Sequence, residues 1–448
     1  MSKDSRGRLG ITGRRGLRMI EPLRLRDFRL LWTGMTVSLV GDGVFLVAMA
    51  WQVYELSNAP TALSVVGVAV SLPHVTLLVL GGVVSDRVDR RRVMVSADAV
   101  RGLAVGAMGV LAVTGAIHLW HLIALAALYG GATAFFGPAF DAIVPDLVPP
   151  GQLAEANSLD QFVRPAAFRL AGPAVAGLVI AVGGTGTAFL FDAATFLVSG
   201  LCIVSMHARA IPASAGSGEA GGDSGLDRAR EGFRFVRTRV WLWGTFAAAA
   251  LAYLLFMGPT EVLIPYVVKH QLGGGPETLG LVFAMGGLGA ILGAVVMGQR
   301  GVPRRHITFM YVVWTMATLA VAGYGLARAS WQAMTAGFVF NCFETVGTIV
   351  WATTKHRLVP GALLGRVSSF DWMISIGLVP ISFAITGPVA AVFGARTTLV
   401  GAGVLGAAVT LGGLFLPGMR DIERRGLLFR SEEPGAAEPA SELAIGSL

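Results

Sequence analysis

The sequence predicts an all-α membrane protein with twelve transmembrane helices arranged as two pseudo-symmetric six-helix bundles. Three observations lead to this fold class: the composition, the number of long apolar runs and an internal repeat. Of the 448 residues, 54% are hydrophobic and only 14% are charged, and the mean hydropathy is +0.68. Because soluble domains are about a quarter charged, this chain has too few polar residues to cover a globule in water.

Long apolar runs recur along the chain, and each approaches the length of about 20 residues that a helix needs to cross the bilayer core. We expect membrane helices over residues 29–51, 62–84, 93–115, 120–140, 161–182, 186–206, 242–266, 278–299, 307–327, 331–352, 367–391 and 395–417. Glycine and proline are frequent in the chain, with 60 and 20 residues. Membrane helices tolerate both where neighbouring helices satisfy the freed backbone groups.

An internal repeat supports the division into two bundles. Six positions recur 211 residues later in one register, namely Leu147, Val148, Pro149, Leu153, Ser158 and Asp160 as Leu358, Val359, Pro360, Leu364, Ser369 and Asp371. Gly172-Pro173 recurs as Gly387-Pro388, and Pro60 with Leu63 recurs as Pro276 with Leu279. Two such copies predict six-helix halves related by an axis along the membrane normal, a plan found in secondary transporters.

The longest polar interruption divides the spans six and six. The expected parts are a basic N-terminal segment (1–27), a first bundle (28–206), a central linker (207–240), a second bundle (241–417) and a disordered tail (418–448). Within the linker, the Gly- and Ser-rich residues 213–225 indicate a flexible tether. Residues 227–239 alternate charged and apolar side chains and favour a surface helix.

The distribution of positive charge predicts the orientation in the membrane. If the N-terminus is cytoplasmic, 29 Lys and Arg residues fall on inner segments and three, Lys269, Arg328 and Arg396, fall on outer loops. Since cytoplasmic loops are rich in Lys and Arg, we expect both termini in the cytoplasm and the protein in the inner (plasma) membrane. The net charge of +8 comes from short clusters between apolar runs, which argues against nucleic acid as a partner.

The loop after the second predicted span carries a recognisable motif. Residues 82–92 read Gly-Val-Val-Ser-Asp-Arg-Val-Asp-Arg-Arg-Arg, which resembles the G-x-x-x-D-R-x-G-R-R loop of the major facilitator superfamily. The matching residues are Gly82, Asp86, Arg87, Arg90 and Arg91, and Asp89 stands where the pattern has glycine. The resemblance implies that Asp86, Arg87, Arg90 and Arg91 latch an inner gate through charge and helix-end contacts.

Other segments resemble the bacterial enterobactin and macrolide exporters of the same superfamily. Residues 25–32 and 138–149 fit this group, and the resemblance covers residues 22–420. Gly172-Pro173-Ala-Val-Ala-Gly177 in the fifth span matches the G-P-x-x-x-G part of a signature that exporters carry. The resemblance implies the major facilitator fold and the export of small lipophilic or amphipathic compounds.

Three of the acidic residues inside predicted spans are candidates for function, because an ionisable side chain is costly at that depth. Asp42 is near the middle of the first span, Glu344 is in the middle of the tenth, and Glu261 follows Gly258-Pro259 in the seventh. We expect Asp42 and Glu344, from opposite halves, to carry the coupling protons, with Glu261 as a further candidate. Each could instead bridge two helices, and Glu261 could extend toward the outer surface.

The remaining charges in the spans are interpreted as structural. Asp98 and Arg101 are three residues apart on one helix face and predict a neutralising intramembrane pair. Arg164 and Arg169 in the fifth span favour pairing with carboxylates over attracting an anionic cargo. Asp192 lies near the end of its predicted helix and indicates a capping or interface position.

The sequence argues against several other classes of protein. It holds no G-x-x-x-x-G-K-[ST] loop, and its histidines lack metal-ligand spacing, so we expect no nucleotide, metal or cofactor and no enzymatic activity. Cys202 and Cys342 both lie in apolar runs and are expected to be packing residues. We expect the protein to act as a monomer in the bilayer.

The predicted function is secondary active transport by a proton-coupled efflux antiporter that moves drugs or metabolites through alternating access. A carboxylate in a partly dry cavity holds either a proton or a polar cargo, so the two compete for one site. An alternative is a dedicated exporter of a siderophore or another secondary metabolite. A third hypothesis is a non-transporting sensor or scaffold, for which deletion of residues 213–225 abolishes activity, whereas a transporter tolerates a shorter tether.

Overall fold

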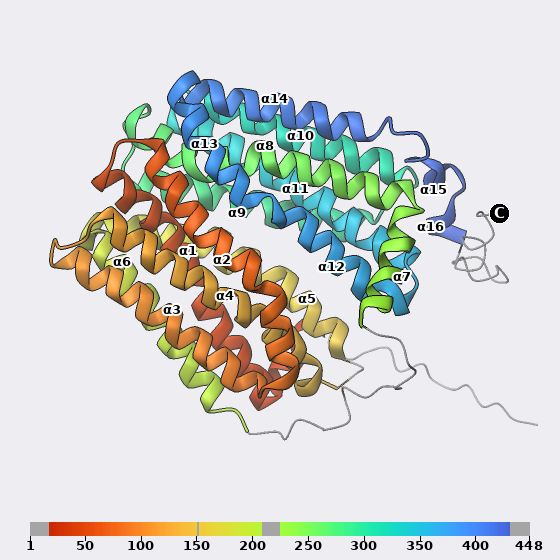
Figure 1. Ribbon diagram of the computed structural model, residues 1–448, viewed down its shortest axis with the longest axis horizontal. Helices are drawn as coiled ribbons and strands as arrows, with labels where there is room; N and C mark the ends of the chain where they lie inside the picture. The colour runs from red at the N-terminus through yellow and green to blue at the C-terminus, as the bar shows by residue number, and fades with distance from the viewer. Residues whose placement is uncertain (1–17, 150–151, 208–224, 431–448) are drawn as a thin grey trace, which may run out of the picture.

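The computed structural model describes residues 18–149, 152–207 and 225–430, and within these ranges it contains no strand. Long helices run side by side in two groups (Figure 1). The long helices are α1 (Arg26–Leu56), α2 (Pro60–Arg87), α3 (Arg90–Val113), α4 (Leu119–Leu147), α5 (Leu153–Arg164), α6 (Gly172–Val204), α8 (Val240–His270), α9 (Pro276–Arg300), α10 (His306–Leu326), α11 (Ser330–Leu358), α12 (Gly361–Gly377), α13 (Val379–Phe393) and α14 (Ala395–Gly413). The short helices are η1 (Arg18–Arg24), η3 (Pro165–Ala171), α7 (Gly225–Arg237), α15 (Asp421–Arg424) and α16 (Leu427–Arg430).

The described ranges provide twelve membrane crossings, as the sequence predicted. Eleven helical segments are long and apolar enough to cross a membrane. The longest, Glu155–Val204, comprises two crossings, because Gly184 adopts a φ of +76° and interrupts the helical backbone. Glycine reaches this region without the steric cost that a Cβ atom adds.

Proline marks the starts and breaks of several helices. Pro60 and Pro276 occupy the first turns of α2 and α9, where the missing N–H is not needed. Pro380 lies at the start of α13 and cannot donate a backbone hydrogen bond to α12. The predicted span over 367–391 is therefore two helices placed end to end.

The hydrophobic core shows how the first half (α1–α6) and the second half (α8–α14) fit together. We call the end that carries α7 and α15 the linker end, and the opposite end, with the α1–α2 loop, the far end (Figure 1). One cluster contains residues of both halves, such as Leu63 with Val262 and Leu279 near the far end. Toward the linker end, a separate cluster lies within each half. The halves are thus joined at the far end and part toward the linker end.

Polar contacts reinforce the closure at the far end. The Tyr54 hydroxyl on α1 donates a hydrogen bond to the carbonyl oxygen of Val262 on α8, 2.7 Å away. Lys269, also on α8, donates to the carbonyl oxygen of Tyr54 at 2.7 Å and lies 4.9 Å from the centre of the Trp51 ring. Each bond crosses from one half to the other.

Two close glycine contacts join the halves at the repeated segments. A Cβ atom at Gly387 on α13 would lie 2.6 Å from the Cα of Thr61, next to Pro60 on α2. A Cβ atom at Gly177 on α6 would lie 2.8 Å from the Cα of Glu277, next to Pro276 on α9. Gly387 is the glycine of its Gly-Pro pair, whereas Gly177 lies five residues after Gly172, so the two contacts differ in register. Each nevertheless brings its helix against the helix start of the opposite half.

Part of the segment expected to be a disordered tail is folded. Met419, Ile422 and Leu428 are buried in the core cluster of the second half. The carboxylate of Glu423 accepts hydrogen bonds from the backbone N–H and hydroxyl of Thr308, at 2.8 and 2.9 Å, and so caps the start of α10. The rest of the segment expected to be a disordered tail, from residue 431 on, lies outside the described residues.

The surface helix expected in the linker is α7, which begins two residues earlier than expected and packs on α12. Arg366 on α12 pairs with Glu231, Nη1 to Oε2, at 2.5 Å, and the rings of Phe233 and Phe370 are 6.1 Å apart. The tether proposed for residues 213–225 lies outside the described residues, except for the first residue of α7. The second bundle therefore has a polar helix fastened across its linker end.

Candidate functional site

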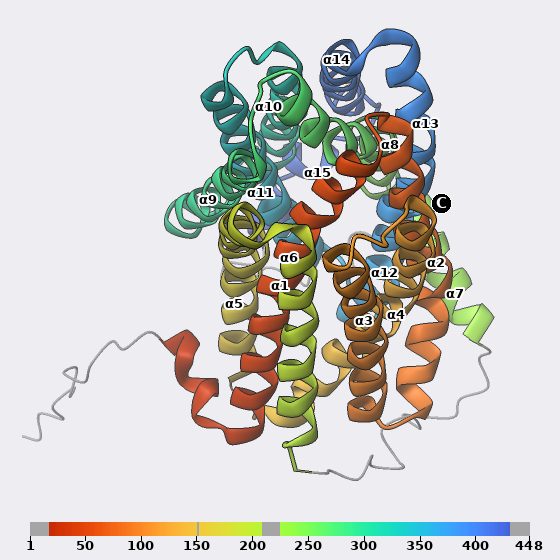
Figure 2. The same cartoon turned by 90° about the vertical axis from the view of Figure 1, so that its left-hand side faces the viewer.

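A buried acid cluster occupies the middle of the first half, where α1, α3, α4 and α6 run beside one another (Figure 2). The Tyr129 hydroxyl on α4 donates a hydrogen bond to Oδ1 of Asp42 on α1, 2.6 Å away. Arg101 on α3 places Nη1 4.0 Å from Oδ2 of Asp42, and its Nη2 donates to Oδ1 of Asp98. The side chains predicted as an isolated pair thus belong to a larger cluster that includes Asp42.

Asp192 on α6 is another member, and the sequence analysis missed it. Its exposed fraction is 0%, and the Thr195 hydroxyl donates to its Oδ1 at 3.1 Å. It packs against Gly41, where a Cβ atom would collide with Oδ1 of Asp192 and the Thr195 hydroxyl. Asp192 lies about two turns beyond Gly184, well inside its crossing rather than at a helix end. Gly41, next to Asp42, was the available sequence signal for a neighbouring side chain, because a residue without a Cβ atom leaves room for a second acid.

Arg101 is the cation at the centre of the cluster. Its guanidinium lies 4.5 Å from the ring centres of both Phe136 and Phe196, so two aromatic faces stabilise its charge away from water. Its exposed fraction is 3%, and that of Asp98 is 1%. One arginine therefore serves three carboxyl groups in a region where uncompensated charge is costly.

The Gly172-Pro173-x-x-x-Gly177 motif connects this cluster to the second half. A Cβ atom at Gly172 would lie 2.6 Å from the Cα of Gly43, so α6 contacts the backbone of α1 one residue after Asp42. Five residues along, Gly177 faces Glu277 on α9. A change in the packing around Asp42 therefore has a short route to the interface between the halves.

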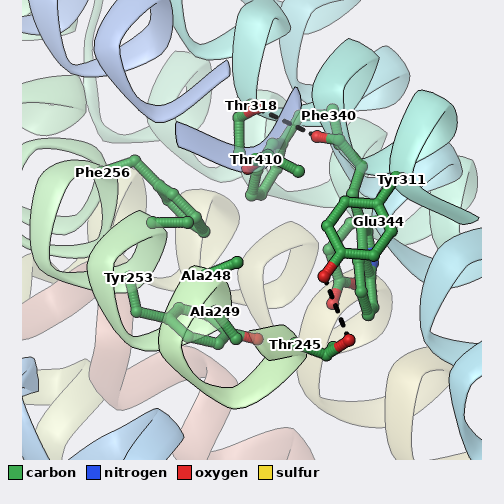
Figure 3. Close-up of a pocket in the computed structure, with 13 residues that line it drawn as sticks. Thr245, Ala248, Ala249, Tyr253, Phe256, Tyr311, Thr318, Phe340, Glu344 and Thr410 are labelled. Atoms are coloured by element: carbon green, nitrogen blue, oxygen red, sulfur yellow. Dashed lines mark hydrogen bonds between the residues drawn. The ribbon is translucent and has the colours of Figure 1, made fainter. Parts of the chain in front are cut away.

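Glu344 lines a pocket in the second half, between α8, α10, α11 and α14 (Figure 3). The pocket wall is rich in aromatic side chains, namely Tyr253, Phe256, Tyr311, Trp314 and Phe340. The Thr348 hydroxyl donates to Oε1 of Glu344 at 3.0 Å. The enclosed space is about 60 Å³, enough for several water-sized groups but smaller than a pocket that surrounds a whole drug.

Arg169 connects the halves near the third candidate acid. It lies on the π-helical turn η3, and its Nη1 donates to Oδ1 of Asn341 on α11, 2.5 Å away. The charged neighbour of Glu261 is this guanidinium. An amide oxygen thus takes the place of the carboxylate expected for Arg169, whereas Arg164 pairs with Asp160 at 3.1 Å.

The three candidate acids occupy separate places. Asp42 belongs to the cluster of the first half, Glu344 to the aromatic pocket, and Glu261 to α8 near Arg169. The described residues show no hydrogen bond or ion pair between Asp42 and Glu344. A direct exchange between these two carboxylates is therefore not part of this conformation.

The loop motif begins at the end of α2. Gly82 and Arg87 lie in its last turns, and the side chain of Asp86 lies outside the described residues. Asp89, which replaces the usual glycine, accepts a hydrogen bond from the backbone N–H of Arg92 at 3.1 Å and caps α3. The departure from the motif therefore has a local use, since an aspartate is a favourable N-cap.

Two arginines of the motif hold the ends of other helices. Arg90 donates from Nη1 to the carbonyl oxygen of Ala142 at 2.9 Å and to Oδ2 of Asp146 at 2.5 Å, both on α4. Arg91 donates to the carbonyl oxygens of residues 203 and 204, at 3.3 and 2.9 Å, where α6 ends. A cation at a helix C-terminus satisfies free carbonyls and complements the helix dipole.

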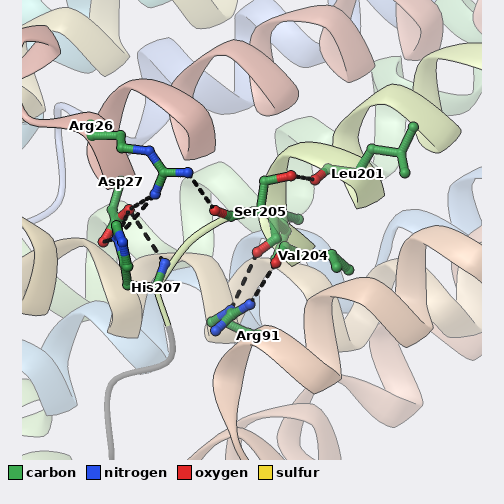
Figure 4. Close-up of polar contacts among 8 residues, drawn as sticks. Arg26, Asp27, Arg91, Leu201, Val204, Ser205 and His207 are labelled. Atoms are coloured by element: carbon green, nitrogen blue, oxygen red, sulfur yellow. Dashed lines mark hydrogen bonds and ion pairs between the residues drawn. The ribbon is translucent and has the colours of Figure 1, made fainter.

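A second arginine approaches the same end of α6 (Figure 4). Arg26 donates from Nη2 to the carbonyl oxygen of Ser205 at 3.1 Å. Asp27 lies beside it, with Oδ1 3.1 Å from Nδ1 of His207, the first residue of the expected linker. The end of α6 is therefore held by arginines of both α1 and α3, and the first residue of the linker is held by α1.

Comparisons with known proteins agree with this architecture. The family model described as transmembrane secretion effector, of the MFS class, matches residues 18–427. The chain is 27% identical over 418 residues to multidrug efflux pump Tap of Mycolicibacterium fortuitum, covering 90% of this chain and 97% of that protein. It is 22% identical over 367 residues to macrolide efflux protein A of Streptococcus pyogenes, covering 80% and 88%.

Solved structures show the same fold. A bacterial homologue of the iron transporter ferroportin in an inward-facing state superposes with a TM-score of 0.62 at 17% identity, covering 87% of this chain and 98% of that one. The matched family model spans nearly the whole of the described helices. The protein is thus a multi-pass membrane transporter, and it belongs to the transmembrane secretion effector family of the major facilitator superfamily.

Proposed function

We propose that this transporter is a proton-driven antiporter that exports small lipophilic compounds from the cytoplasm, with the acid cluster of the first half as its proton site. The observation that carries the proposal is a cluster of three carboxyl groups and one buried arginine, in which Asp98 and Asp192 are buried and the Asp42 side chain is 14% exposed. With every carboxyl ionised the cluster would hold two excess negative charges. Protons relieve that excess where water cannot.

The arrangement of the halves supports export by alternating access. The linker end carries the basic loop motif and the start of the linker, so the positive-inside rule assigns it to the cytoplasm. Both termini are then cytoplasmic, and the parted linker ends give an inward-open conformation. The Gly172–Gly177 motif, between the cluster and α9, supplies the route by which proton occupancy changes the contact between the halves.

The named cargoes of the relatives favour antibiotics and other drugs as substrates. One relative is a multidrug efflux pump and another is a macrolide efflux protein. An apolar and aromatic wall such as that around Glu344 suits compounds of this kind. We expect one chain to suffice for transport, because both halves of the path belong to it.

Proteoliposomes with an imposed pH gradient test the proposal. The wild-type protein should accumulate a radiolabelled macrolide when the gradient is present, and Asp42→Asn or Asp192→Asn should abolish this accumulation. Exchange of labelled for unlabelled macrolide without a gradient should continue, because cargo exchange needs no proton transfer. Asp421→Asn, an exposed aspartate on α15, is the matched control and should behave as wild type.

Two outcomes would contradict the proposal. Gradient-driven accumulation by both cluster variants at the wild-type rate would remove the acids from coupling. Wild-type accumulation that persists after both the pH gradient and the membrane voltage are collapsed, or that requires ATP, would exclude proton-driven transport.

A further inference from the structure

We propose that the pocket around Glu344 binds the ammonium group of the cargo, and hence that the preferred substrates are lipophilic amines and quaternary ammonium cations. The inference rests on the proposed export function and adds to it the chemical class of the cargo and the place of its charged group. It assigns the two acidic sites different tasks: the cluster around Asp42 holds protons, and Glu344 contacts the cargo.

The geometry of the pocket wall supports a cationic ligand. The rings of Tyr253 and Phe256 have centres 5.4 Å apart, and Phe256 and Phe340 follow at 5.6 Å. Tyr311 and Trp314 form a second pair at 6.2 Å. Aromatic faces carry negative potential, so a wall of this kind attracts a cation with apolar substituents and offers nothing to an anion.

Glu344 is the charged group in this wall. The hydroxyls of Thr245 and Tyr311, also in the wall, are 3.0 Å apart and bond to each other (Figure 3). Glu344 receives the Thr348 hydroxyl bond on one oxygen. In the described part of the chain it makes no salt bridge, which is a costly state at membrane depth unless a ligand brings the counter-charge.

The nearby cations of the protein are held by other groups. Lys355 on the same helix donates to Oδ2 of Asp371 at 2.7 Å. Arg169, from the first half, is bonded to Asn341 at 2.5 Å. An ammonium ion from the cargo is therefore the available partner for Glu344 in this conformation.

The dimensions fit a headgroup rather than a whole drug molecule. Gly347 on α11 leaves room for the Trp314 side chain, because a Cβ atom at Gly347 would collide with the indole Nε1 of Trp314. The indole therefore packs against α11 one turn from Glu344. The enclosed 60 Å³ admits a small alkylammonium group. The body of the cargo then extends toward Asn341, one turn away on the same helix face.

This position couples cargo to the contact between the halves. Asn341 already binds Arg169 of the first half, so a bound cargo lies beside a bond that joins the two halves. A cation at Glu344 and the Arg169 guanidinium repel each other, which weakens that bond when the pocket is occupied.

Equilibrium binding to the purified full-length protein in nanodiscs tests the inference without any gradient. The probe is tritiated benzyltriethylammonium, measured by a proximity assay, and benzenesulfonate of similar size is the anionic comparison. We expect Glu344→Gln to weaken cation binding about tenfold, because it removes the negative charge of the pocket wall but keeps the side-chain shape. Phe340→Leu should weaken it by a factor of about three to ten, because it removes one aromatic face.

Two controls make the result specific. Glu277→Gln, the same change at an exposed site of the second half, should leave the affinity unchanged. Asp42→Asn should also bind the cation as wild type, although the proposed function expects it to lose gradient-driven transport, so the two proposals fail separately. Melting temperatures of all variants establish that each is folded.

The inference is overturned if Glu344→Gln and Phe340→Leu both bind the cation within twofold of wild type. It is also overturned if the wild-type protein binds benzenesulfonate as tightly as benzyltriethylammonium.

Discussion

The two halves share one helical plan, yet they treat their intramembrane acids differently. In the first half, Asp42 and Asp98 pair with Arg101, and the buried Asp192 lies beside Gly41, next to Asp42. In the second half, Glu344 faces a pocket and makes no salt bridge within the described residues. A repeated backbone therefore does not imply a repeated site. In the first half a buried cation joins the acids into a network, whereas in the second half a single acid without a salt bridge remains available to a ligand.

The largest expected effect comes from removing the central cation. Arg101→Met leaves three carboxyl groups without a counter-charge, and breaking a buried pair in this way costs about 3–5 kcal/mol. We expect a large fall in the melting temperature of the purified protein, partly recovered by adding Asp98→Asn. A stable Arg101→Met protein with full transport would show that the first half does not depend on a closed network.

Lys355→Met is the matched change in the second half and should be milder. Its partner Asp371 retains the hydrogen bond from the Trp351 indole N–H at 2.9 Å, and its side chain is 15% exposed. The comparison of the two melting temperatures isolates the effect of central burial. An equal fall for both variants would mean that burial does not distinguish the two cations.

The next effect concerns the two close glycine contacts between the halves. A Cβ atom at Gly177 or Gly387 meets backbone atoms under 3.0 Å away, and such overpacking costs about 1–3 kcal/mol. Gly177→Ala and Gly387→Ala should therefore shift the protein away from the far-end-closed state. Spin labels at Ser57 and Gly273 should report a longer distance, while Gly401→Ala, which has open space, should not change it. A longer distance in only one of the two variants, Gly177→Ala or Gly387→Ala, would contradict the expectation that both contacts hold the far end closed.

The smallest effects concern side chains that bind helix ends at the linker end. Arg91→Met frees the end of α6 in the first half and Glu423→Ala frees the start of α10 in the second. A helix-end charge or cap contributes about 0.5–2 kcal/mol, so each variant should lower the melting temperature by a few degrees and leave cation binding unchanged. A loss of gradient-driven transport by Arg91→Met at unchanged stability would instead assign this residue to gating.

The sequence was sufficient for the fold because lipid imposes a simple rule on helix length and apolar content. It located Asp42 and Glu344, since an acid inside a long apolar run is conspicuous. It could not join Asp42 to Asp192, 150 positions later, because side-chain neighbours on different helices depend on packing. Nor could it reveal that Arg169 meets Asn341 rather than a carboxylate. The folded segment around Glu423 was missed because its helices are one turn long, too short for a periodic signal.

The division of the core into one shared and two separate apolar clusters has a consequence for energetics. Opening of the far end exposes the apolar surface of the shared cluster. Closure of the linker end brings apolar surfaces of the two halves together there. The transport cycle therefore exchanges one apolar interface for another. Two conformations of similar free energy are shifted by a bias of a few kcal/mol. Under the proposed function, a single proton or a single bound cargo molecule would supply such a bias.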